Sequence, residues 1–236
     1  MSIHLETLKT RSFTALIFAT VMLTGLLVNG YTYLALFSII MLGCVYEFSK
    51  IARLINGDKY FYFLPLAFGY IILPLMLLID LGMNGLFYLH QSVVSENAID
   101  SYSPILPCAI IFSIWINDTM AYIVGSLIGK TPFSSISPKK TWEGTIGGVI
   151  LCVVAIYFLA TSIAYTKTIH WNHWVMIAAI CGVAGTIGDL FESKLKRLAN
   201  IKDSGSFMPG HGGFLDRFDS LLMATPFVWL YIKLNF

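Results

Sequence analysis

Long apolar runs recur along the whole of this 236-residue chain, and they constrain its fold more than any other feature. A helix needs about 20 predominantly apolar residues to cross the hydrocarbon core of a bilayer. Runs that approach this length lie at residues 13–29, 31–48, 61–80, 104–128, 144–165, 174–190 and 214–235. The composition agrees, because 12% of the residues are charged, whereas about a quarter are charged in a typical soluble domain. We therefore predict an all-α, multi-pass integral membrane protein with about seven transmembrane helices.

The basic residues predict the orientation of these spans, because cytoplasmic loops hold an excess of Lys and Arg. If the N-terminus is cytoplasmic, 13 of the 15 basic residues fall in inner segments, and only Lys167 and Lys233 fall in outer ones. The first span follows a short basic head and has no evident cleavage site, so we expect an uncleaved anchor. The net charge of +2 reflects this asymmetry and indicates no nucleic-acid partner. We predict a multi-pass protein of the bacterial cytoplasmic membrane.

The character of the chain changes near Pro104. Before it the spans are almost uniformly apolar, and after it charged and small residues enter the spans. We predict a single membrane domain over 1–236, in which 1–103 are apolar N-terminal spans and 104–236 carry the catalytic spans and cytoplasmic loops. Glu47, at the inner end of the second span, can reach the interface by extending its side chain. A contact between Glu47 and the site is the less favoured alternative.

Acidic residues inside the later spans need a reason, because inserting an ionised side chain costs at least ~2.5–3.5 kcal/mol. Asp118 has Tyr122 one helical turn later on the same face, although a hydrogen-bonded core Asp is the alternative. Asp189 is followed at +3, +4 and +7 by Glu192, Ser193 and Lys196, which share its face.

Asp216 and Asp219 repeat the pattern three residues apart in the last span. With a cytoplasmic N-terminus, these carboxylates and Asp189 belong to the same side of the membrane. Separated carboxylates suit a hard divalent cation such as Mg²⁺, which is commonly held by one or two carboxylates together with substrate phosphates. The pattern therefore predicts a metal-assisted phosphate site.

Cations and glycines adjoin these acids and favour the same interpretation. Glycines between Gly205 and Gly213 would let the backbone approach a phosphate closely. Paired lysines also stand in SPKKTWEG, Ser137–Gly144, where a phosphate contact is favoured over a simple topology signal. GSLIGKT, Gly125–Thr131, is not a P-loop, because it has three residues between its glycines where that motif needs four.

The segment Ser193–Asp219, which we call the signature segment, resembles the signature of the CDP-diacylglycerol synthase (phosphatidate cytidylyltransferase) family. It contains Ser-x-x-Lys-Arg, Lys-Asp-x-Gly, Pro-Gly-His-Gly-Gly and Asp-Arg-x-Asp in order. The resemblance also includes NDTMAY, SPKKTWEG and GDLFES, and spans roughly residues 115–220. The first hundred residues resemble the family only in being hydrophobic.

The resemblance implies transfer of CMP from CTP to phosphatidic acid, with release of pyrophosphate, by an enzyme of phospholipid biosynthesis embedded in the lipid bilayer. It implies Mg²⁺ with a second cation, for which K⁺ is a candidate, and association of two copies as a homodimer. It assigns catalytic roles to Asp189, Asp216, Asp219 and Lys196, of which Asp189 and Asp216 bind metal. It assigns substrate binding to Asp118, Tyr122, Ser137, Lys139, Lys140, Thr141, Ser193, Arg197, Lys202, His211 and Arg217. For His211, a phosphate contact and an ordering role in its loop stay open.

Two other functions are compatible with parts of the sequence. A CTP-dependent kinase of polyprenol or phytol type shares the needs for membrane, metal and CTP, but transfers the γ-phosphoryl group to a hydroxyl. An ion-coupled transporter would explain carboxylates inside spans. It would not explain why acids, cations and glycines gather on one side of the membrane.

Overall fold

The computed structural model describes residues 5–84, 102–167, 169–208 and 212–236, and within these ranges the chain is helical without β-strands. The N-terminal helices are α1 (Leu5–Leu27), α2 (Gly30–Asn56), the 3₁₀ helix η1 (Gly57–Phe63), α3 (Leu64–Ala67), the π-helical turn η2 (Phe68–Ile72) and α4 (Leu73–Met83). The later helices are α6 (Ile105–Ile128), α7 (Trp142–Ser162), η3 (Ala164–Thr166), α8 (Trp171–Leu198) and α9 (Leu215–Asn235). The predicted all-α fold is confirmed.

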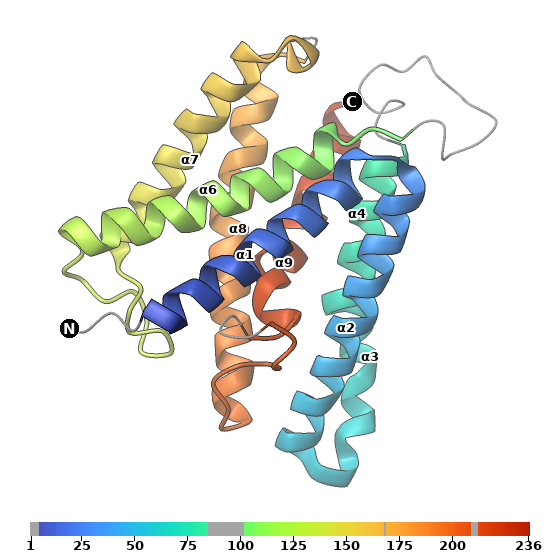
Figure 1. The fold of residues 1–236 in the computed structure, drawn as a ribbon, viewed down its shortest axis with the longest axis vertical. Helices are drawn as coiled ribbons and strands as arrows, with labels where there is room; N and C mark the ends of the chain where they lie inside the picture. Colours follow the sequence, from blue (N-terminus) through green and yellow to red (C-terminus); the bar gives the residue numbers. More distant parts are fainter. Residues whose placement is uncertain (1–4, 85–101, 168, 209–211) are drawn as a thin grey trace.

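Each predicted apolar run overlaps a helix or a series of consecutive helices. Four helical stretches of the described chain are long and apolar enough to cross a membrane, namely Gly30–Met83, Ile105–Ile128, Trp142–Ser162 and Trp171–Leu198. The first of these folds back on itself, because α2 and α4 pack against each other on either side of η1 (Figure 1). Membrane-spanning helices are thus confirmed, whereas the count of seven and the cytoplasmic N-terminus stay predictions.

The helices form a bundle in which α8 and α9 are central (Figure 1). α6 packs on α7, α7 on α8, and α8 on α9, while α4 from the N-terminal half also contacts α9. The α4 contact includes a hydrogen bond of 2.7 Å from Trp229 Nε1 to Asp80 Oδ2. The start of α1 and the end of α6 lie on the left of the view, whereas the C-terminus and the end of α7 lie towards its top (Figure 1).

Small residues bring α6 and α7 into close contact. A Cβ added to Gly148 would lie 2.9 Å from the backbone nitrogen of Ala121, and one added to Gly144 would lie 2.9 Å from Gly125 Cα. Membrane helices that approach this closely gain packing contacts that larger side chains would prevent. The close approach brings the end of α6 beside the start of α7, where the polar residues of the site gather.

Candidate functional site

A pocket of about 520 Å³ lies where α6, the loop after it, the start of α7 and the middle of α8 meet. We call it the α6–α8 pocket. Its polar lining includes the predicted substrate-binding residues Asp118, Tyr122, Ser137, Lys139, Lys140 and Thr141, together with Asp189. The structure therefore brings together residues from three segments of the chain, as their shared chemistry predicts.

The loop between α6 and α7 is folded by its own hydrogen bonds. Glu143 accepts hydrogen bonds from the backbone nitrogens of Lys130 and Thr131 and from Thr131 Oγ1, at 2.8–3.2 Å. Thr141 caps α7, because its Oγ1 accepts a hydrogen bond of 3.1 Å from Gly144 N. A cap of this kind pairs a backbone N–H that has no partner within the helix. The loop thus presents its paired lysines at a defined position.

The two lysines have different surroundings. Lys140 Nζ forms an ion pair with Asp189 on α8, while Lys139 is exposed and has no ion pair within the described chain. Asn117, a pocket residue that the sequence analysis did not single out, is 3% exposed. Its Oδ1 has no hydrogen-bond partner among the described residues. Because buried acceptors are nearly always paired, an unpaired oxygen at this position is unusual.

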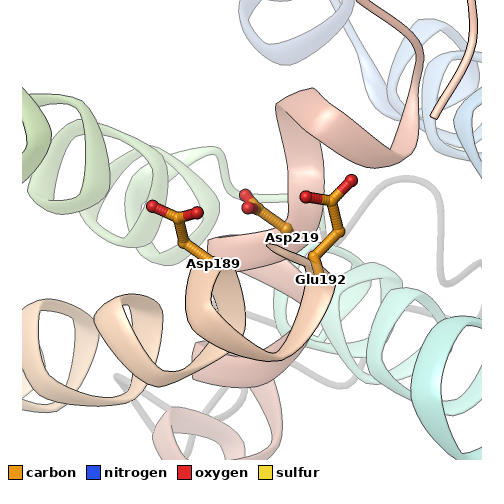
Figure 2. Close-up of side chains that lie close together, drawn as sticks. All are labelled: Asp189, Glu192 and Asp219. Carbon is orange, nitrogen blue, oxygen red and sulfur yellow. The ribbon is translucent and has the colours of Figure 1, made fainter. Parts of the chain in front are cut away.

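A cluster of three carboxylates lies beside the pocket (Figure 2). Asp189 and Glu192 extend from α8, Asp219 extends from α9, and one oxygen of each lies within 4.8 Å of the others. We call these residues the acidic cluster. Glu192 and Asp219 are buried, and Asp189 belongs to both the acidic cluster and the α6–α8 pocket.

Glu192 completes the acidic cluster although only its helical spacing from Asp189 pointed to it. Its Oε2 pairs with Lys196, whereas its Oε1 has no hydrogen-bond partner among the described residues. Three close carboxylates repel one another unless cations or protons compensate them. Unpaired carboxylate oxygens in a buried cluster fit a hard cation such as Mg²⁺, which takes oxygen ligands.

Asp216 lies at the start of α9, outside the acidic cluster but joined to it through Lys196. Its Oδ1 accepts a hydrogen bond of 2.6 Å from Lys196 Nζ, and its Oδ2 accepts hydrogen bonds of 2.8 Å from the backbone nitrogens of Ser204 and Gly213. Gly212, at φ +82°, has no room for a Cβ because the Asp216 carboxylate lies against it. Asp216 therefore holds the loop of the signature segment in the described structure. Its predicted role as a metal ligand stays a prediction.

The other predicted site residues have varied positions. Ser193 donates a hydrogen bond of 3.3 Å to Asp189 Oδ1, beside the acidic cluster. Arg197, Lys202 and Arg217 are exposed and are not part of the pocket lining. His211 lies outside the described residues.

Comparison with known proteins finds one family and relatives that share one named activity. The model of the cytidylyltransferase family matches residues 76–235, which include every helix of the site. Phosphatidate cytidylyltransferase of Bacillus subtilis (strain 168) is 43% identical over 124 residues, which are 51% of this chain and 45% of the relative.

Two further relatives carry the same activity in their names. Phosphatidate cytidylyltransferase 4, chloroplastic, of Arabidopsis thaliana is 42% identical over 120 residues, which are 49% of this chain and 29% of the relative. Phosphatidate cytidylyltransferase of Thermotoga maritima is 36% identical over 129 residues, which are 53% and 48% of the two chains. The matched segment thus spans less than half of the length of these curated relatives.

Proposed function

Because the chain belongs to the cytidylyltransferase family, we propose that it transfers CMP from CTP to phosphatidate, giving CDP-diacylglycerol and pyrophosphate. The observation that supports this best is the double position of Asp189. Its carboxylate pairs with Lys140 in the α6–α8 pocket and also belongs to the acidic cluster. A polyphosphate held by the lysines of the pocket would therefore lie next to a group of metal-binding oxygens.

CTP binds in the α6–α8 pocket under this proposal. Its volume of about 520 Å³ lies within the range of about 300–1,000 Å³ that is usual for ligand pockets. Lys139 and Lys140 neutralise phosphate oxygens, and Asn117 lines the same pocket. Asp118 and Tyr122 line the part of the pocket formed by α6.

Under this proposal, oxygens of Asp189, Glu192 and Asp219 in the acidic cluster would hold Mg²⁺. When bound, the ion would offset the charge of the cluster and of the polyphosphate. A second cation, for which K⁺ is a candidate, and the assignment of Asp216 as a ligand are further predictions of the family resemblance.

The reaction needs alignment and charge neutralisation more than a strong base. A phosphate oxygen of phosphatidate is already anionic, and it forms a bond to the α-phosphorus of CTP while the bond to pyrophosphate breaks. Lys140 can stay with the phosphates as its pairing with Asp189 loosens, and Lys196 keeps Glu192 and Asp216 in position. Holding the two substrates in line is itself a large part of the rate enhancement.

The lipid substrate and the topology belong to the same proposal. The apolar helices would keep the acyl chains of phosphatidate in the bilayer. The distribution of basic residues favours a site on the cytoplasmic side, where CTP is present. The homodimer implied by the resemblance would be tested by the mass of the complex in detergent.

The test is an assay of the purified chain in detergent with phosphatidate, α-labelled CTP and Mg²⁺. We expect labelled CDP-lipid and pyrophosphate, and we expect Asp189→Asn to abolish both while the protein still folds. In a parallel assay with a polyprenol in place of phosphatidate, labelled CDP and a phosphorylated lipid alcohol would indicate a kinase instead. Near-normal pyrophosphate release from Asp189→Asn would overturn the site.

Binding of Mn²⁺, followed by electron paramagnetic resonance, separates the two candidate ligand sets without relying on activity. Asp189→Asn and Asp219→Asn should both lose bound Mn²⁺. Asp216→Asn should retain it if Asp216 acts only on the loop, and should lose it if Asp216 is a ligand. Retention of Mn²⁺ by Asp219→Asn would remove that residue from the ligand set.

A further inference from the structure

Glu47 on α2 is a buried carboxylate that contacts the signature segment, more than 150 residues later in the chain. It is 5% exposed. Its Oε2 accepts hydrogen bonds from Ser204 Oγ at 2.7 Å and from Leu215 N at 2.9 Å, and its Oε1 accepts one from Phe214 N at 3.0 Å. The Glu47 side chain therefore does not extend to the membrane interface, which was the favoured prediction, but lies buried against the signature segment.

The two backbone nitrogens belong to the first turn of α9. Phe214 is the N-cap residue of that helix and its own side chain provides no cap. The first N–H groups of a helix have no partners within the helix, and a negative charge beside them is favourable. Glu47 thus acts as an N-cap supplied by another helix, and it fixes the start of the helix that carries Asp216 and Asp219.

Three glycines leave the space that this arrangement requires. A Cβ on Gly205 or Gly213 would overlap the Glu47 carboxylate. A Cβ on Gly43, one turn before Glu47 on α2, would overlap the Phe214 ring. Glycines on both sides of the contact are therefore explained by the fit of α2 against the signature segment.

Ser204 connects Glu47 to Asp216. Its hydroxyl lies 2.7 Å from Glu47 Oε2 and 3.0 Å from Asp216 Oδ2, but it has one proton to donate. Asp216 Oδ2 already receives the backbone N–H groups of Ser204 and Gly213, so the shorter contact to Glu47 is the better use of that proton. Glu47, Ser204 and Asp216 then form one continuous network that ends at Lys196 and Glu192.

We propose that Glu47 is a positioning residue for the cytidylyl transfer. It caps α9 from α2, and so it keeps Asp219 in the acidic cluster and Asp216 in its place beside Lys196. The inference rests on the proposed function for its catalytic consequence. Glu47 also lies outside the part of the chain that the family model matches, which begins at residue 76. The N-terminal half therefore contributes to the site and is more than an anchor.

The decisive variant is Glu47→Gln, which keeps the shape but turns one acceptor oxygen into an NH₂ donor that faces other donors. We expect kcat to fall by about 10²-fold, the loss that a displacement of about 1 Å can cause. KM for CTP should stay close to that of the unaltered chain, because Glu47 does not line the α6–α8 pocket. Glu47→Asp keeps the charge and should retain more activity than Glu47→Gln.

Asp80→Asn is a matched control, because Asp80 also joins the N-terminal half to α9 through Trp229, in the later part of that helix. It should lower thermal stability without lowering kcat of the folded protein. If Glu47→Gln and Asp80→Asn lose stability alike and both keep kcat, Glu47 is only structural and the proposal is wrong.

Hydrogen exchange gives a readout that does not depend on catalysis. The backbone amides of Phe214 and Leu215 should exchange faster in Glu47→Gln than in the unaltered chain or in Asp80→Asn. Unchanged exchange at these amides would overturn the capping role even if activity fell. An unaltered chain that shows no transfer would instead overturn the proposed function, and the exchange measurement would still test the cap.

Discussion

Lys139 and Lys140 are neighbours in the sequence, yet single substitutions should separate their roles. Lys139 is exposed without an ion pair in the described chain, whereas Lys140 pairs with Asp189. Lys139→Gln should therefore raise KM for CTP by about 10-fold, since a hydrogen bond to a charged group contributes about 1.5–3 kcal/mol. Lys140→Gln should lower kcat as well, because it leaves Asp189 without its cation.

Steady-state kinetics at varied CTP measure this difference, with Lys59→Gln as the control. Lys59 is exposed and does not line the α6–α8 pocket. Equal effects of Lys139→Gln and Lys140→Gln on both kinetic constants would contradict the distinction.

Gly213 should tolerate a methyl group poorly, because a Cβ there would overlap both oxygens of the Glu47 carboxylate. We expect Gly213→Ala to lower kcat by up to about 10²-fold by displacing the start of α9. Gly69→Ala is the control, since a Cβ at Gly69 meets nothing within 4 Å. Full activity of Gly213→Ala would mean that α2 and the signature segment can separate without consequence.

The residues of the site were predictable where a charged side chain stands out in an apolar stretch of the sequence. Asp189, Lys139 and Lys140 stand out because charges in an apolar chain need a reason, and the structure brings them together. Glu192 was indicated only by its helical spacing from Asp189, and Asn117 only by its place beside Asp118. Their burial and unpaired oxygens are visible in the structure alone. For Glu47, a contact with the site was only the less favoured prediction, because its partners are more than 150 residues away and no local pattern points to them.

At the scale of elements, the pocket depends on the close packing of α6 and α7. A Cβ on Gly148 would meet the backbone of Ala121, whereas a Cβ on the neighbouring Gly147 would meet only the side chain of Val124. Either Gly→Ala change favours helix by up to about 1 kcal/mol. A side chain can shift where backbone cannot, so Gly147→Ala should be less destabilising than Gly148→Ala. Gly148→Ala should lower thermal stability and raise KM for CTP.

Thermal unfolding in detergent and CTP kinetics of the two variants test this packing. A stabilised Gly148→Ala with unchanged KM would show that the distance between α6 and α7 does not set the shape of the pocket.

The elements themselves were largely predictable, because every long apolar run coincides with helix. The run at 61–80 is the exception in detail, since it covers the end of η1, α3, the π-helical turn η2 and most of α4. Pro65 and Pro74 lie in the first turns of α3 and α4, where proline is tolerated but cannot continue a preceding helix. The conformation of the loop between α6 and α7 was not predictable. It depends on hydrogen bonds that Glu143 accepts from residues 12 and 13 positions earlier in the chain.

For the whole molecule, the arrangement of the helices does not divide the chain cleanly into an N-terminal anchor, 1–103, and a catalytic half, 104–236. α4 and α2 both contact α9, and Glu47 reaches the same network as Asp216. The change of character near Pro104 therefore marks where most polar residues begin, while the site draws on both halves. The contribution of the N-terminal half rests on a single buried carboxylate of α2, Glu47, which the composition of that half does not reveal.

Orientation in the membrane is the property of the whole molecule that the sequence predicts and the fold alone does not determine. Thirteen of 15 basic residues belong to inner segments if the N-terminus is cytoplasmic and seven spans are present. Single cysteines at Ser135, Lys167 and Asn235, which are all exposed, would report it once Cys44, Cys108, Cys152 and Cys181 are replaced. Seven spans predict that an impermeant maleimide labels the last two positions in intact cells and leaves the first unlabelled.

A permeant maleimide labels all three positions in the same cells and serves as the control for reactivity. Labelling of Ser135→Cys from outside would put Lys139 and Lys140 on the side without CTP, and the proposed site would then lack its substrate. Protection of Asn235→Cys alone would instead reduce the count to an even number of spans. That outcome would change the topology of α9 without moving the loop before α7, so the two predictions can fail separately.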